Sequence, residues 1–101
     1  MRIITLFDLP VISPEDRREY VKFRRFLIRN GFVMMQESVY TKIALNQTAI
    51  NAVAENLRRN KPPKGLVQIL IVTEKQFAKM ELLIGESSSD VINNDARLII
   101  L

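Results

Sequence analysis

Apolar residues dominate four short segments of the chain, and each segment is bounded by turn-forming residues. The segment 2–8 is apolar at most positions and is stopped by Pro10, which predicts a central strand that ends in a turn. Segments 32–35 and 38–45 are two further strand candidates, separated by a polar pair. Segment 66–72 is an almost unbroken apolar run, so we expect a strand that is buried on both faces or close to it.

Two other segments follow the helical period. Segment 13–16 contains a serine, a proline and two acidic residues, which predict a capped helix start, and an Asn-Gly pair some fifteen positions later predicts the helix end. The apolar side chains between them share one broad arc. Arg17 and Arg24 fall inside this arc, so we expect both arginines to extend out of the core, to pair, or to face a partner. The same spacing predicts a second helix over 46–60.

The predicted order of elements is βαββαβ, the split βαβ arrangement of ferredoxin-like domains. In this α+β fold an antiparallel sheet carries helices on one face only. The other face would expose a large apolar patch, which monomers avoid, so we expect two copies to form a homodimer through their sheets. We expect a single ferredoxin-like domain over 1–101, with 1–72 as the core and 73–101 as a C-terminal extension.

The extension is more than a compact domain of this kind needs. Its first residues, 73–76, resemble a capping box that opens a short helix. Segments 80–84 and 97–101 could each form an edge strand, and we expect at least one of them to pair with the sheet edge of a second protomer. The extension would then be exchanged between the two copies.

The composition excludes several chemistries. The chain of 101 residues has no cysteine and no histidine, which excludes disulfides, zinc fingers, thiol nucleophiles and imidazole bases. Any catalysis must then use carboxylates, tyrosine, lysine or a metal-activated water. No segment is apolar for long enough to span a membrane, and the N-terminus is interrupted too early for a signal peptide, so we expect no membrane contact and a cytoplasmic location.

Asp8 is the candidate residue for chemistry, because it ends an apolar strand. An ionised carboxylate at the edge of a core costs several kcal/mol when nothing pairs with it, roughly enough to exclude an idle one. Either Asp8 accepts hydrogen bonds from the backbone of the loop that follows it, or it holds something.

The net charge of +4 favours an anionic partner, which for basic domains is most often nucleic acid. Basic residues recur every three or four positions on the first helix and form a stripe about 16 Å long. A second basic cluster surrounds a Pro-Pro loop. Both sets could simply be solvated, but a dimer doubles the stripe, which is then long enough to follow a duplex. The predicted nucleic-acid contacts are Arg17, Arg18, Lys22, Arg25, Arg29, Arg58, Arg59, Lys61 and Lys64.

Four sequence features occur together: RIITLFDLP, an arginine-bearing helix that opens on Pro14, SVY at 38–40, and LVQILIVTEKQF. In this combination the chain resembles the CRISPR-associated protein 2 family, the small subunit of the CRISPR spacer-acquisition machinery. The resemblance covers essentially the whole chain. The C-terminal TEKQFAKMELLIGE followed by ARLIIL resembles the variant found in CRISPR systems with a single large effector nuclease, the type II systems.

The resemblance implies a ferredoxin-like homodimer that acts as a magnesium-dependent endoribonuclease, bridges two dimers of the CRISPR integrase subunit and binds the duplex DNA to be inserted. It assigns the functional aspartate to Asp8 and Tyr40 to the dimer interface. One Asp8 would bind Mg²⁺ poorly, because the ion prefers octahedral oxygen coordination. Two Asp8 side chains that face each other across a two-fold axis could share the ion, which could then activate a water against a phosphodiester.

The sequence leaves the choice of function open. The main hypothesis is a scaffold that bridges integrase dimers and binds prespacer DNA without reading its sequence. The second is a nuclease that cleaves single-stranded RNA or duplex DNA through paired Asp8 and Mg²⁺, and whether cleavage occurs is not decided. A small-molecule sensor is disfavoured because no Gly-rich loop shapes a ligand cleft. Base stacking on the sheet is disfavoured because SVYTKIA lacks the glycine-aromatic signature of RNA-recognition motifs.

Overall fold

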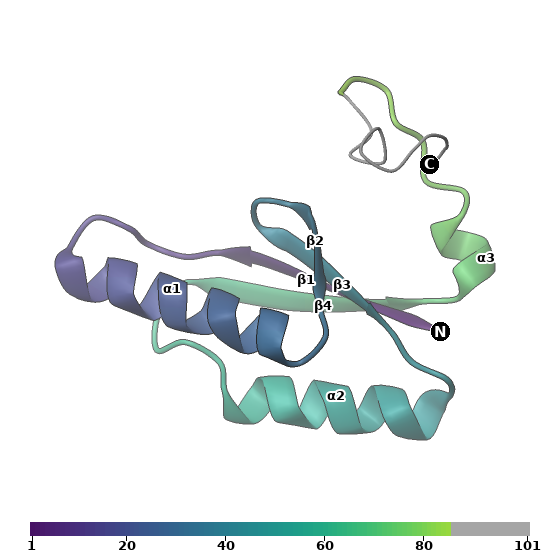
Figure 1. The fold of residues 1–101 in the computed structure, drawn as a ribbon, viewed down its shortest axis with the longest axis horizontal. Helices are drawn as coiled ribbons and strands as arrows, with labels where there is room; N and C mark the ends of the chain where they lie inside the picture. Colours follow the sequence, from purple (N-terminus) through teal and green to yellow (C-terminus); the bar gives the residue numbers. More distant parts are fainter. Residues whose placement is uncertain (86–101) are drawn as a thin grey trace.

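The computed structural model describes residues 1–85 and arranges them in the βαββαβ order that the sequence predicts, followed by one short helix (Figure 1). The observed bounds of the helices and strands lie within two residues of the predicted ones. In chain order the elements are β1 (Arg2–Asp8), α1 (Pro14–Arg29), β2 (Val33–Gln36), β3 (Val39–Ile43), α2 (Gln47–Arg59), β4 (Leu66–Val72) and α3 (Glu74–Phe77).

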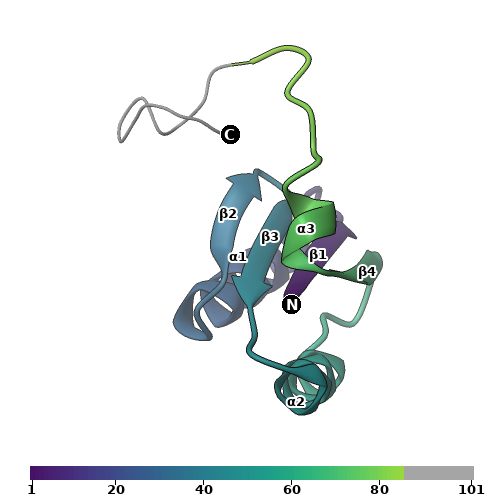
Figure 2. The ribbon, with the colours of Figure 1, turned by 90° about the vertical axis from the view of Figure 1, so that its right-hand side faces the viewer.

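The four strands form one antiparallel sheet in the order β2-β3-β1-β4. β1 is central, as predicted, because it pairs with β3 on one side and with β4 on the other. Figures 1 and 2 show α1 and α2 on the same side of the sheet. The sheet therefore has one face covered by helices and one face without them, which confirms the ferredoxin-like fold.

The helix ends form where the capping residues predict them. The Ser13 hydroxyl accepts a hydrogen bond from the Asp16 amide at 3.0 Å, and the Asp16 carboxylate accepts one from the Ser13 amide at 3.3 Å, which completes a capping box at the start of α1. Asn46 caps α2 by accepting a hydrogen bond from the Ala49 amide at 2.9 Å. A glycine with φ of 85° follows α1, where the left-handed backbone ends the helix.

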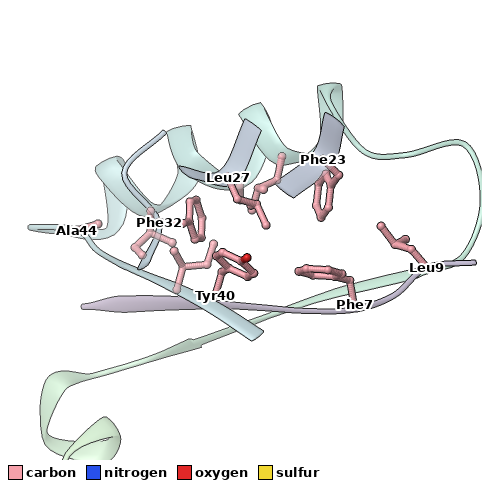
Figure 3. Packing of buried hydrophobic residues seen from close by; sticks show 11 residues of the cluster. Phe7, Leu9, Phe23, Leu27, Phe32, Tyr40 and Ala44 are labelled. Atoms are coloured by element: carbon pink, nitrogen blue, oxygen red, sulfur yellow. The ribbon is translucent and has the colours of Figure 1, made fainter. Parts of the chain in front are cut away.

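The core lies between the sheet and the two covering helices and is built around aromatic side chains (Figure 3). The Phe7 ring on β1 packs edge-on against the Phe23 ring of α1, with centroids 5.3 Å apart, and stacks on the Tyr40 ring of β3 at 5.7 Å. Leu27 of α1 and Ile50 of α2 are fully buried in the same cluster. Because Phe7 and Tyr40 point into this core, the side chains that alternate with them on β1 and β3 point to the opposite face of the sheet.

Tyr40 is a core residue in this structure, which corrects its assignment to the dimer interface. Its exposed fraction is 0% within one chain, and its hydroxyl accepts a hydrogen bond from the Arg24 Nε at 2.9 Å. Tyr40 lies opposite Thr5 of β1, and side chains opposite each other share a face of the sheet. That face carries the helices, so the Tyr40 ring has no surface left for a second protomer.

The expected burial of β4 is also wrong for the single chain, whereas the expected pairing of the C-terminal segments with a second protomer is not tested by it. β4 is an edge strand without a fully buried side chain. Val67 and Ile69 pack against the core, but Leu66 is 54% exposed and Leu70 is 52% exposed, because helices cover only one face of the sheet. Segment 80–84 forms no strand within residues 1–85, although α3 begins with the predicted capping box at Thr73. Segment 97–101 lies outside the described residues, so exchange of strands between protomers stays a prediction.

Candidate functional site

Asp8 lies on the face of the sheet that the helices leave uncovered. Successive side chains of a strand point to opposite faces, and Phe7 points into the core. Asp8 therefore shares the other face with Leu6 and Ile4, and it lies opposite Leu66 of β4. The candidate carboxylate is placed at the end of the central strand, on the surface that carries the outward apolar side chains.

The Asp8 carboxylate is exposed and has no hydrogen bond or ion pair with any residue of the described range 1–85. The interpretation of Asp8 as a cap of the following loop is therefore not what the structure shows. Arg17 holds that loop instead, since its guanidinium donates hydrogen bonds to the carbonyls of Val11 at 3.2 Å and Ile12 at 2.8 Å. Asp8 remains available to a ligand or a partner.

The described residues 1–85 do not supply a complete magnesium site by themselves. Residues 1–85 contain no group of three or more Asp, Glu, His or Cys side chains close enough to hold an ion. Mg²⁺ in proteins commonly uses one or two carboxylates together with waters and substrate phosphates. The residues present fit such an ion only if a second Asp8, or a bound phosphate, completes the site.

The outer side of α1 forms an open basic groove. Pro14 and Val21 contribute apolar contacts, and five basic side chains line the remainder: Arg17, Arg18, Lys22, Arg25 and Arg29. The last four make no ion pair with any other residue in the part of the chain that the structure describes. Their charges are therefore not neutralised within residues 1–85 and can be matched by phosphates.

Arg17 and Arg24 pair within the chain, one of the outcomes expected for arginines inside the apolar arc of α1. Arg17 binds the loop carbonyls described above, and Arg24 donates to the buried Tyr40 hydroxyl. In both arginines the guanidinium reaches a polar acceptor of the same chain. Arg17 is thus committed to the loop after Asp8, although it also lines the basic groove.

The second basic cluster, around the Pro-Pro loop, is engaged in local contacts. Arg58 and Arg59 both lie near the Glu55 carboxylate, at 3.2 and 3.9 Å, and the Lys61 Nζ donates to the Arg58 carbonyl at 3.1 Å. Lys64 pairs with Asp16 at 3.3 Å. Partial burial opposes ionisation of Asp16, but hydrogen bonds from Ser13 and Lys64 outweigh it and leave the pKa of Asp16 below its ordinary value. These residues are less available to phosphates than the α1 groove.

The uncovered face of the sheet carries an apolar patch of large side chains from β2, β3 and β4. The pairing register places Val33, Ile43, Leu66 and Leu70 on the same face as Ile4 and Asp8. Their exposed fractions range from 52% to 66%. Exposed apolar surface of this kind marks an interaction site more often than ordinary surface.

Sequence reasoning missed one residue beside Asp8. Gly65 follows two prolines and a lysine, and its backbone packs directly against Asp8 and Leu9. The signal available in the sequence was a glycine immediately before a strand, which often marks a left-handed or closely packed backbone position.

No helix within residues 1–85 combines the length and the apolar character required to cross a bilayer.

The fold and the groove define the chain as a small ferredoxin-like domain with a basic surface along its first helix. Comparison with known proteins defines the family more closely. Residues 1–80 match the profile of the family described as CRISPR associated protein Cas2. The chain therefore belongs to the Cas2 family.

Individual relatives agree with this assignment. The chain is similar to a CRISPR-associated endoribonuclease Cas2 of Treponema denticola, which is 54% identical over 101 residues and covers the full length of both chains. A protein of the same name from Streptococcus mutans is 48% identical, with 100% of this chain and 93% of the relative covered. The crystal structure of Streptococcus pyogenes Cas2 at pH 6.5 resembles the fold with a TM-score of 0.61 at 13% identity, covering 82% of this chain and 99% of that one.

Proposed function

We propose that the chain is a subunit for acquisition of new CRISPR spacers, acting as a homodimeric scaffold that binds duplex prespacer DNA and bridges dimers of the CRISPR integrase. The observation that carries this proposal is the division of the molecule into two sides. The apolar patch and Asp8 share the uncovered face of the sheet, whereas the basic groove lies on the outer side of α1. Dimerisation through the uncovered face would leave both grooves accessible.

Two such grooves would bind a duplex through its phosphates. Arg18, Lys22, Arg25 and Arg29 are spaced along about 16 Å of helix, and duplex DNA presents one phosphate charge per about 1.7 Å of axis. Contacts of this kind position a protein on DNA without reading its sequence. A prespacer has no fixed sequence, so backbone recognition suits the proposed role. We further propose that the chain is the type II variant and acts in the cytoplasm.

Charge reversal in the groove tests the DNA-binding part of the proposal. If a dimer neutralises about six phosphates, its log-log salt slope is about −5. The double variant Arg18→Glu and Arg25→Glu removes four basic charges from the dimer, so the slope should fall towards about −2 and the affinity should drop at every sequence. The measurement is fluorescence anisotropy with two unrelated duplexes over a range of salt concentrations.

The second basic cluster provides a matched control. Arg58→Glu and Arg59→Glu change the charge by the same amount, but both arginines already lie near Glu55. This variant should keep most of the affinity of the original chain. An equal loss of binding in the two double variants would remove the α1 groove from its proposed role, because nonspecific charge would then explain the result.

A magnesium-dependent nuclease acting on single-stranded RNA or duplex DNA is the second candidate function, and the unpaired Asp8 carboxylate favours it. The names of the relatives, CRISPR-associated endoribonuclease Cas2, support the same activity. In the proposed dimer, Asp8 of each protomer would hold the ion, which when bound supplies an acidified water and charge neutralisation at the phosphate. In this proposal each chain would present one carboxylate at the symmetry axis, so that the dimer supplies two.

Asp8→Asn separates the two candidate functions. The substitution keeps the shape of the side chain and removes its charge, so magnesium-dependent cleavage should be lost while duplex binding and spacer acquisition are retained. Glu37→Gln is the control, because Glu37 is an exposed carboxylate in the turn between β2 and β3. Cleavage that persists at the original rate in Asp8→Asn would exclude Asp8 as the catalytic carboxylate, whereas loss of acquisition would show that the carboxylate is needed by the scaffold itself.

A further inference from the structure

We propose that Gly65 is a positioning residue for the Asp8 carboxylate. This inference rests on the proposed nuclease function, in which Asp8 acts at the end of β1. Gly65 does not belong to β1, the strand that ends at Asp8; it immediately precedes Leu66, the first residue of β4. Its backbone packs against the backbone of Asp8 and Leu9 so closely that only a glycine fits there.

Two features of Gly65 exclude a side chain. Its φ is +92°, a left-handed conformation that residues with a Cβ rarely adopt. A Cβ added at this position would also lie 2.7 Å from the Asp8 carbonyl oxygen, 2.8 Å from the Leu9 Cδ2 and 3.1 Å from the Leu9 Cα. The nearest of these atoms belongs to the backbone and cannot rotate away. A side chain at position 65 must therefore move the chain at Asp8.

The other two glycines of the chain lack this contact. Gly31 has a similar φ of +85°, but its added Cβ would meet only the end of the flexible Lys42 side chain, with the Nζ at 3.3 Å. Gly85 has φ of +126° and would meet only the Leu82 Cδ1 at 3.7 Å. Gly31 is therefore a matched control that shares the backbone conformation of Gly65 and differs in what a side chain would displace.

The contact with the Asp8 backbone matters because no hydrogen bond or ion pair within residues 1–85 holds the Asp8 side chain. The carboxylate has no hydrogen bond or ion pair in that range, so its position is set by the backbone that carries it. Three features fix that backbone. Asp8 pairs with Leu66 in the sheet, Leu9 is buried with 8% of its surface exposed, and Gly65 packs closely against both Asp8 and Leu9. A shift at position 65 therefore reaches the carboxylate directly.

The test compares Gly65→Asn with Gly31→Asn. Asparagine tolerates a positive φ better than other residues with a Cβ, so both variants should fold, and the pair isolates the contact from the backbone strain. In the metal-free chain, Gly65→Asn should shift the amide resonances of Asp8, Leu9 and Leu66, whereas Gly31→Asn should shift only signals near Lys42. Cleavage by Gly65→Asn should fall by about tenfold or more at equal thermal stability, because small misplacements of a catalytic group are costly.

The outcomes distinguish this inference from the proposed function. If the original chain shows no magnesium-dependent cleavage, the nuclease proposal fails, while the amide shifts of the metal-free variants still test the role of Gly65. If Gly65→Asn leaves the Asp8 and Leu9 amides no more displaced than Gly31→Asn does, the positioning role is excluded. It is also excluded if Gly65→Asn cleaves at the original rate while Asp8→Asn is inactive.

Discussion

Tyr40 is the residue at which packing and sequence motif disagree. Its ring stacks on Phe7 in the core, and its hydroxyl is bound by Arg24 at 2.9 Å. The motif suggested a dimer contact, but the alternation along β3 decides the matter, because Tyr40 lies opposite the inward-facing Thr5. The same alternation could have been read from the sequence once strand 39–43 was paired with strand 2–8.

The core role of Tyr40 predicts the result of Tyr40→Phe. The substitution keeps the ring and removes one hydrogen bond to a charged group, so the free energy of unfolding should fall by about 1 to 2 kcal/mol. Self-association should not change, because the side chain has no exposed surface. Urea denaturation and sedimentation velocity measure the two effects. A folded Tyr40→Phe chain that no longer associates would restore the dimer-interface assignment.

Asp8 shows what sequence can and cannot determine about a site residue. Its place at the end of an apolar strand singled it out, because an unpaired carboxylate there calls for an explanation. The sequence could not show that Arg17 occupies the carbonyls of the following loop, nor that Gly65 packs beneath Asp8. The Arg17 contacts span only five and six residues, but they depend on the exact shape of the loop. The Gly65 contact joins segments that are far apart along the chain, so it depends on the tertiary fold.

At the scale of elements, α3 closes the end of the sheet beside the N-terminus. Arg2 of β1 makes two hydrogen bonds to the Glu74 carboxylate, at 2.7 and 3.0 Å, and its guanidinium carbon lies 3.9 Å from the centre of the Phe77 ring. Figure 2 shows α3 near the ends of β1 and β4. These contacts fix the direction in which the chain leaves the domain after the last strand.

The Arg2–Glu74 pair predicts a pH dependence. The hydrogen bonds from Arg2 hold the pKa of Glu74 below its ordinary value of 4.5. The pair therefore stabilises the folded chain fully above pH 4.5, and this contribution is lost as the pH falls through the lower pKa of the folded state. Because the Glu74 side chain is 47% exposed, the contribution should be about 0.5 kcal/mol.

Glu74→Gln tests this contribution. The difference in melting temperature between the original chain and Glu74→Gln should be constant from neutral pH down to about pH 5 and should shrink below that. Glu81→Gln is the control, since Glu81 is exposed and carries the same charge without an ion pair in residues 1–85. Amide exchange at Phe77 reports α3 directly. A difference that grows as the pH falls would contradict the assigned direction of the pKa shift.

Helices and strands were predictable here because their signals are local. Caps at Ser13, Asn46 and Thr73 are set by residues within three positions, and the structure reproduces all three. The burial of β4 was not predictable in the same way. An apolar run at 66–72 indicates a strand with two apolar faces, but which face is covered depends on where the helices pack. The residues of 66–72 are enough to predict a strand there, but its burial depends on how distant segments pack against it.

At the scale of the whole molecule, charge and apolar surface are separated. The α1 groove carries basic side chains without internal ion pairs in residues 1–85, while the uncovered sheet face carries Val33, Ile43, Leu66 and Leu70. The two surfaces lie on opposite sides of the sheet. One surface is thus suited to a polyanion and the other to a second apolar surface, and both can be occupied at once.

Leu70→Glu tests the proposed dimer, because Leu70 lies near the middle of β4 on the uncovered face and is 52% exposed. Burying an unpaired charge costs several kcal/mol, so the dissociation constant of the dimer should rise by at least about 100-fold. Ile28→Glu is the matched control, since Ile28 is 48% exposed but lies on α1. Sedimentation equilibrium over a range of concentrations measures both variants.

Loss of the dimer should change DNA binding in a defined way. Each Leu70→Glu monomer keeps one complete α1 groove, so it should still bind duplex DNA, but with about half the salt slope of the dimer. It should lose magnesium-dependent cleavage entirely, because one chain supplies a single Asp8 carboxylate at that position. A Leu70→Glu chain that remains dimeric would place the interface elsewhere. A monomer that still cleaves would show that Asp8 does not need its symmetry mate.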